Sequence, residues 1–168
     1  MGDLLVNPVI RLRPIAPRFG LRRATGATAH YERGVALEAS DPVGAMAAYH
    51  RALAGLPAFA DAHNNLGRLH HDAGRLGDAE SHYRLALCVD RTVSLYWFNL
   101  GVVLEDQRRD AEAIAAYEQA VALDPRCADA HFNLARLHEV IGRCAGDVLE
   151  IQRAVRYLIA YKSLMRAS

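Results

Sequence analysis

The sequence predicts an all-α fold, a right-handed superhelical stack of about four helix-turn-helix hairpins, which is an α-solenoid. Two observations predict it: similar segments recur about 34 residues apart, and each recurring unit holds two stretches with the apolar spacing of an amphipathic helix. The composition of 30 alanines against 12 glycines and six prolines suits closely packed helices. Because one hairpin cannot bury its own apolar stripe, the hairpins must stack.

The first helix of each unit is the clearest repeat. Three segments superpose without gaps: AHNNLGRLHH at 62–71, YWFNLGVVLE at 96–105 and AHFNLARLHE at 130–139. They share an asparagine followed by a leucine and then by glycine or alanine. We expect each segment to form one helix that presents its small residue to the second helix of its hairpin.

The second helix follows after a short turn, as GDAESHYRLAL at 77–87 and DAEAIAAYEQAV at 110–121. The shared positions are Ala79 and Ala113, Tyr83 and Tyr117, and Ala86 and Ala120. This pattern resembles the tetratricopeptide repeat family, whose signature has a small residue at position 8, Ala at 20, an aromatic at 24, Ala at 27 and Pro at 32. Trp97 also occupies the family's aromatic position 4, and Pro125 occupies position 32.

The resemblance implies four units within a domain of residues 27–168. The expected boundaries are 27–59, 60–93, 94–127 and 128–166. The first unit, HYERGVALEASDPVGAMAAYHRALAGLP at 30–57, lacks one residue in its turn. The last unit ends in a capping helix near 147–166, whose basic residues we expect to face water: Arg153, Arg156, Lys162 and Arg166.

Residues 1–26 match no part of the repeat. They carry five arginines against Asp3 alone, with three prolines, so we expect a basic leader that is extended or disordered. A tail without function, an arm that touches nucleic acid or anionic lipid, and the remnant of a longer protein are all open interpretations. A transit peptide is disfavoured, because the prolines would interrupt its amphipathic helix.

The composition disfavours several other classes of protein. Residues 27–168 carry 15 basic and 18 acidic groups, which argues against a nucleic-acid footprint on the folded part. Cys88, Cys127 and Cys144 have no CxxC spacing, so neither a disulfide framework nor a zinc module is indicated. No run of 18 apolar residues occurs. We therefore expect a cytoplasmic chain with no membrane association.

The resemblance also implies a binding surface, because ligands of this family usually lie along the concave face formed by the first helices. Positions 2, 5, 6, 9, 12 and 13 of each unit share that face by helical spacing. The same face includes Leu95 and Val102. The candidate groove residues are Tyr31, Asp61, Asn64, Asn65, Arg68, His71, Phe98, Asn99, Glu105, Asp129, Phe132, Asn133 and Arg136.

Asn65, Asn99 and Asn133 recur on one line of this face. An amide both donates and accepts, so the line can pair with the backbone of an extended peptide. It resembles the asparagine ladder of O-linked N-acetylglucosamine transferases, and the alternative is a family consensus residue without a ligand. Three such bonds supply about 1.5–4.5 kcal/mol, less than the about 8 kcal/mol of a micromolar complex, so aromatic residues must contribute or binding is weak.

Metal, catalytic and chaperone-tail chemistries are less favoured. His63 and His70 stand about 10.5 Å apart along a helix, too far to share one ion, so packing inside the hairpin is the favoured interpretation. No nucleophile motif or phosphate-binding loop occurs. The family's carboxylate clamp uses lysines, and Lys162 is the chain's one lysine. We expect no cofactor, no metal and no catalysis.

The predicted function is a non-catalytic adaptor that binds an extended peptide or helix of a partner protein in the groove. Two alternatives stay open: the sensor domain of a transcription regulator, and the substrate-binding region of a glycosyltransferase-like protein whose other domain is absent. The sequence does not identify the partner, and a monomer is the favoured state.

Overall fold

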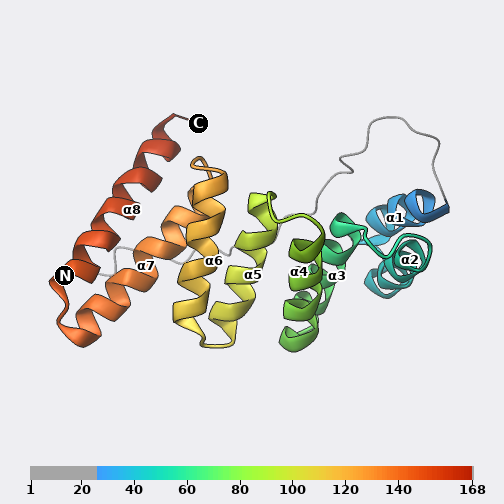
Figure 1. Ribbon diagram of the computed structural model, residues 1–168, viewed down its shortest axis with the longest axis horizontal. Helices are drawn as coiled ribbons and strands as arrows, with labels where there is room; N and C mark the ends of the chain where they lie inside the picture. The colour runs from blue at the N-terminus through green and yellow to red at the C-terminus, as the bar shows by residue number, and fades with distance from the viewer. Residues whose placement is uncertain (1–25, 168) are drawn as a thin grey trace.

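The computed structural model describes residues 26–167. These residues form eight helices (Figure 1): α1 (Gly26–Leu37), α2 (Pro42–Gly55), α3 (Ala60–Asp72), α4 (Leu76–Val89), α5 (Ser94–Asp106), α6 (Asp110–Leu123), α7 (Ala128–Ala145) and α8 (Val148–Arg166). Each odd-numbered helix pairs with the next helix to form a hairpin. The predicted all-α repeat stack is confirmed. The leader predicted at residues 1–26 lies outside the described residues, except that Gly26 begins α1.

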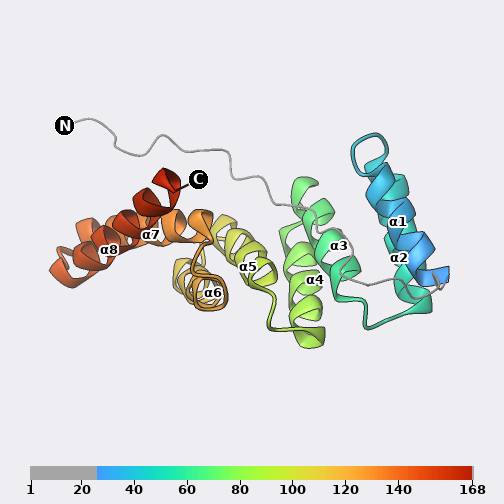
Figure 2. The same ribbon diagram turned by 90° about the horizontal axis from the view of Figure 1, so that it is seen from above.

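The four hairpins lie side by side along the long axis of the molecule, from α1 and α2 at one end to α7 and α8 at the other (Figure 1). Seen from above, the stack bends into an arc (Figure 2). Helices α3, α5 and α7 lie towards the inner side of this arc, and α4 and α6 lie on its outer side. The first helices of three consecutive hairpins therefore share one surface, called the inner face below.

A small residue lets the two helices of each hairpin meet. A Cβ atom added to Gly67 would lie 2.8 Å from the ring of Tyr83, and one added to Gly101 would lie 2.6 Å from the ring of Tyr117. Both tyrosine rings are fully buried. The glycine and the aromatic residue of the repeat pattern are thus two halves of one contact between helices.

The buried apolar side chains form two clusters. One joins α1, α2 and α3 around Tyr31, Tyr49 and Leu66. The other runs from α4 to α7 around Tyr117 and Leu134. The division falls inside the second hairpin, between α3 and α4, so this hairpin links two separate parts of the core.

The turns inside the second and third hairpins use the left-handed backbone region. Gly74 has φ of 74° after α3, and Arg108 has φ of 63° at the same place after α5, one repeat later. Arg108 is the one non-glycine residue with positive φ among residues 26–167. A side chain at such a position carries backbone strain that glycine avoids.

The last hairpin departs from the pattern. Its first helix, α7, has 18 residues, whereas α3 and α5 have 13 each. Helix α8 presents its basic residues to water, namely Arg153, Arg156, Lys162 and Arg166. It also exposes apolar side chains that the predicted polar end did not include: Val148, Leu149, Val155, Ile159 and Met165.

No helix among residues 26–167 is both long enough and apolar enough to span a bilayer. The cysteines are free thiols, with Cys88 and Cys144 exposed and Cys127 partly buried.

Candidate functional site

The candidate site is the inner face, where most of the predicted groove residues are buried. Nine of them have at most 9% of their surface exposed: Tyr31, Asp61, Asn64, Asn65, Arg68, Phe98, Asn99, Phe132 and Asn133. Four are partly exposed: His71, Glu105, Asp129 and Arg136. The repeating positions therefore point largely into the junctions between hairpins.

A polar network closes the junction between the first and second hairpins. The Tyr49 hydroxyl donates to Glu38 at 2.5 Å, and the same carboxylate pairs with Arg68 at 2.5 Å. The Asn65 amide donates to the hydroxyls of Tyr49 and Tyr31, each at 3.2 Å. Arg68, predicted as a ligand-binding charge, thus already has a carboxylate partner.

The junction between the third and fourth hairpins repeats this network. Glu105 pairs with Arg136 and accepts a hydrogen bond from the Tyr117 hydroxyl at 3.2 Å. The Asn133 side chain faces that hydroxyl and acts to lower the pKa of Tyr117. Burial is the main cause that raises the pKa of both Tyr49 and Tyr117 far above the ordinary value, so these hydroxyls stay protonated and can donate.

The middle junction, between the second and third hairpins, lacks this network. Val102 stands where the flanking junctions have arginine, and His71 stands where the last junction has glutamate. The buried Tyr83 hydroxyl has no hydrogen-bond partner among the described residues, and neither has the Asn99 Oδ1 atom. The middle of the inner face therefore combines a half-buried apolar side chain with two unsatisfied polar atoms.

On the inner face, three other side-chain bonds cross this middle junction, and each joins a residue to one that lies one repeat plus one position further along the chain. The Tyr96 hydroxyl donates to Asp61 at 2.5 Å, and the Asn99 amide donates to Asn64 at 2.9 Å. The His71 Nε2 atom lies 2.6 Å from an Asp106 carboxylate oxygen. Tyr96 and Asp106 were not among the predicted site residues. Complementary polar residues at this spacing are the signal that would have found them. Away from the inner face, Glu80 also accepts hydrogen bonds from Gln107 and Arg109 of the third hairpin.

The predicted aromatic anchors pack within the protein. The Phe98 ring lies 5.7 Å from that of Tyr117, and the Phe132 ring lies 5.3 Å from that of Tyr161, measured between centroids. Tyr31 stacks on Phe59 at 4.7 Å. These rings contribute mainly to the junctions between helices.

A pocket of about 480 Å³ opens at one edge of the inner face, beside the start of α3 and the α4–α5 loop. Its lining residues are Ala58, Phe59, Ala60, Asp61, Val89, Asp90, Thr92 and Tyr96. Two carboxylates and two aromatic rings therefore meet at this edge. Asp129, which stands two repeats after Asp61, is partly exposed.

Four histidines from three helices gather on the side of α3 away from Asn65. The Nδ1 atoms of His63 and His82 are 3.2 Å apart, His70 stacks on His82 at 5.2 Å, and the His50 ring lies 6.2 Å from that of His82. Burial, followed by the neighbouring histidines, lowers the pKa of His82 to about 4. Burial also lowers the pKa values of His63 and His70. In residues 26–167 no three side chains are placed to hold a metal ion.

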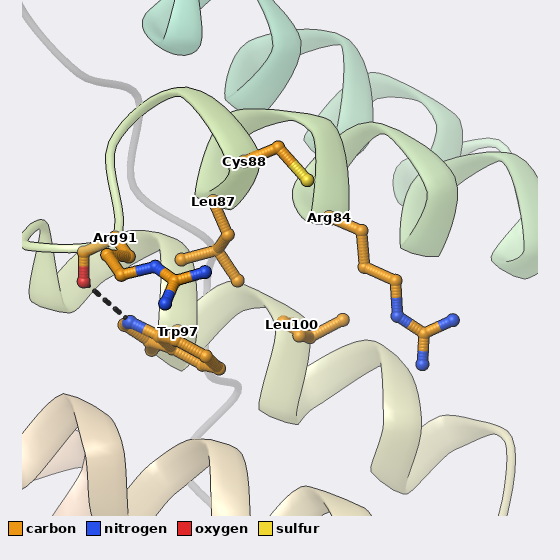
Figure 3. A pocket seen from close by; sticks show the side chains of 6 residues that line it. All are labelled: Arg84, Leu87, Cys88, Arg91, Trp97 and Leu100. Atoms are coloured by element: carbon orange, nitrogen blue, oxygen red, sulfur yellow. Dashed lines mark hydrogen bonds between the residues drawn. The ribbon is translucent and has the colours of Figure 1, made fainter.

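A second pocket, of about 240 Å³, lies between α4 and α5 (Figure 3). Helical spacing places its α5 residues, Trp97 and Leu100, on the side of α5 away from Asn99. This outer pocket is lined by Arg84, Leu87, Cys88, Arg91, Trp97 and Leu100. The Trp97 Nε1 atom donates to the Arg91 carbonyl oxygen at 2.9 Å. His63 and His131, at the equivalent position of the flanking hairpins, make the same bond to the equivalent carbonyl oxygens of Pro57 and Pro125, at 3.1 and 3.0 Å.

Comparison with known proteins identifies the repeat. Two family profiles described as tetratricopeptide repeat match the chain, over residues 36–97 and over residues 98–160. Together they run without a break through the second and third hairpins and into both flanking ones. The chain belongs to the tetratricopeptide repeat family. The glycine–tyrosine contacts of the hairpins are this chain's form of the tetratricopeptide packing, as the sequence resemblance predicted.

Solved tetratricopeptide structures share the fold. The crystal structure of MamA has a TM-score of 0.75 and 17% identity, over 84% of this chain and 79% of its own. The first tetratricopeptide region of Spaghetti (RPAP3), bound to the HSP90 peptide SRMEEVD, has a TM-score of 0.67 and 19% identity, over 70% and 94%. The Arabidopsis OM64 tetratricopeptide domain has a TM-score of 0.65 and 22% identity, over 68% and 95%. Similarity at these identities concerns the fold alone.

A peroxisomal targeting signal receptor from Kluyveromyces lactis is 39% identical over 70 residues. The match covers 42% of this chain and 12% of the receptor's length.

Proposed function

We propose that this tetratricopeptide chain is a non-catalytic protein-binding scaffold that holds an extended segment of a partner protein on its inner face. The observation that carries the proposal is the difference between the junctions. Ion pairs fill the flanking junctions, at Glu38 with Arg68 and at Glu105 with Arg136. On the inner face of the middle junction, the half-buried side chain of Val102 stands where the flanking junctions have arginine.

The asparagine line keeps a narrower role in this proposal. Asn65 is committed to two tyrosine hydroxyls, whereas the Oδ1 atoms of Asn99 and Asn133 have no partner among the described residues. Both atoms are enclosed within the junctions, so we assign the contact with a bound segment to the more exposed part of the inner face around Val102.

The proposed ligand is an internal segment of a partner rather than a chain end. A clamp for a terminal carboxylate needs cationic side chains that are free to pair with it. Both groove arginines, Arg68 and Arg136, already pair with carboxylates of the preceding hairpin. We propose the cytoplasm as the place of action, in keeping with the free thiols.

The test is a selection of random peptides displayed on phage against the full chain, followed by measurement of Kd by fluorescence anisotropy. Val102→Glu places a charge at the middle of the inner face and is expected to weaken the selected peptides at least about tenfold. Leu85→Glu, at an exposed position of α4, is the matched control and leaves the affinity unchanged. Equal affinities for wild type and Val102→Glu, with both variants folded by circular dichroism, would contradict the proposal.

A further inference from the structure

The outer pocket lies on the opposite side of α5 from the inner face, so the proposed scaffold function does not use it. Leu87 and Leu100 form its floor, with 7% and 6% of their surface exposed. The Trp97 ring forms one wall (Figure 3), and its Nε1 bond to the Arg91 carbonyl holds the ring in place. The pocket therefore has a fixed apolar interior.

Its size limits what it can bind. Pockets for drug-sized ligands measure roughly 300–1,000 Å³, whereas this one measures about 240 Å³. One apolar side chain fits such a volume better than a cofactor does.

The rim of the pocket is cationic. Arg84 and Arg91 line it, and no acidic residue does. Arg84 is partly neutralised, because its guanidinium lies 2.7 Å from Glu80 and 3.8 Å from Glu112. The Arg91 guanidinium forms no ion pair with any described residue, and only its backbone carbonyl is engaged. An anion close to Arg91 therefore finds an unshared positive charge.

This rim occurs at one junction of the stack. The counterparts of Arg91 and Trp97, one repeat before and one repeat after them, are Pro57, Pro125, His63 and His131. The floor does not change in the same way, since the counterparts of Leu100 are also leucines, Leu66 and Leu134. The middle junction alone combines the shared apolar floor with a tryptophan wall and an arginine rim.

We propose that the outer pocket is a second protein-binding site, which takes one apolar side chain from a partner segment that carries a carboxylate beside it. The apolar side chain packs on Leu87, Leu100 and Trp97, and the carboxylate faces Arg91. Because the pocket and the inner face lie on opposite sides of α5, the two sites can be occupied together.

Trp97 is the chain's one tryptophan, so intrinsic fluorescence of the full chain reports on this pocket directly. The probe is the peptide acetyl-Ser-Glu-Leu-Glu-Ser-amide at low ionic strength, and a saturable change in emission is expected. Replacing its leucine by alanine weakens binding at least about tenfold, through the lost burial. Arg91→Gln weakens it by up to about fivefold, as expected for an exposed ion pair, and a peptide with both glutamates changed to lysine does not bind.

The cysteines supply a second readout within the same molecule. Cys88 lines the pocket and Cys144 does not, and both are exposed. Saturating peptide slows alkylation of Cys88 by iodoacetamide and leaves Cys144 unchanged. Cys88→Phe fills the pocket from its rim and abolishes the fluorescence response, whereas Val102→Glu retains it, which separates this site from the inner face.

Three results would overturn the proposal: no saturable fluorescence change up to the solubility limit of the probe, equal slowing of alkylation at Cys88 and Cys144, or unchanged binding by a folded Cys88→Phe variant.

Discussion

Gly101→Ala places a methyl group where the third hairpin has no room for one. A Cβ atom at this position would lie 2.6 Å from the Cδ1 and Cε1 atoms of Tyr117. The ring cannot easily move aside, because it is fully buried and its centroid lies 5.7 Å from that of Phe98. Its hydroxyl is also hydrogen-bonded to Glu105. The added methyl group must therefore push α5 away from α6.

Two opposing effects set the magnitude. Overpacking a tight contact costs about 1–3 kcal/mol, while alanine in place of glycine inside a helix returns about 0.5–1 kcal/mol. We expect the free energy of unfolding of Gly101→Ala to fall by about 1–2 kcal/mol. Gly77→Ala is the matched control, because a Cβ atom there meets nothing within 4 Å.

Urea denaturation followed by far-UV circular dichroism measures both variants against wild type. The expected result is a lower denaturation midpoint for Gly101→Ala and an unchanged or higher one for Gly77→Ala. If Gly101→Ala were as stable as wild type, the close contact between α5 and α6 would not be what requires glycine, and the packing argument would fail.

Three further changes test other parts of the structure. Acidification from about pH 7 to about pH 5 should destabilise the fold, because the pKa of His82 is lowered in the folded chain and the unfolded chain takes up a proton that the folded chain excludes. In thermal melts, the melting temperature of His82→Gln should therefore change less with pH than that of wild type. An unchanged pH dependence would count against the histidine cluster. Arg108→Gly should raise the free energy of unfolding by up to about 1 kcal/mol, because it relieves backbone strain, and the flexibility that glycine adds to the unfolded chain offsets part of this gain. Gly74→Ala at the equivalent turn should lower the free energy of unfolding. If urea titrations showed both variants changing stability in the same direction, this explanation would be refuted. Tyr83→Phe removes an unpartnered hydroxyl and should be neutral or stabilising, whereas Tyr117→Phe should cost about 0.5–1.5 kcal/mol; equal losses would show that the junctions do not differ.

The helices and their pairing were accessible from the sequence because they depend on residue size at fixed intervals. Gly67 and Gly101 meet Tyr83 and Tyr117 through shape alone, and the constant spacing from each glycine to its tyrosine is visible in the repeat. The end of the stack was less accessible. Gly142 stands one repeat after Arg108, yet α7 continues past it to Ala145, since Gly142 packs on Ile151 of α8 rather than forming a turn.

The candidate site was predicted less completely, because side-chain partners depend on how far each hairpin is rotated on the next. Superposing the repeats placed Asn65 and Asn99 on one line, but the rotation shifts the contacts by one position, so that Asn99 bonds to Asn64 instead. Helical spacing also could not show that Arg68 would pair with Glu38. The face named from the sequence therefore lies on the inner side of the arc. The hydrogen-bond and ion-pair partners of its polar side chains could be identified only from the structure.

The most direct test of the protein-binding account is photo-crosslinking with a phage-selected peptide that carries a benzophenone side chain, followed by identification of the labelled residues by mass spectrometry. The account predicts attachment on α3, α5 and α7, concentrated on the inner side of α5 around Val102. Attachment confined to α2, α4, α6 or α8 would contradict it.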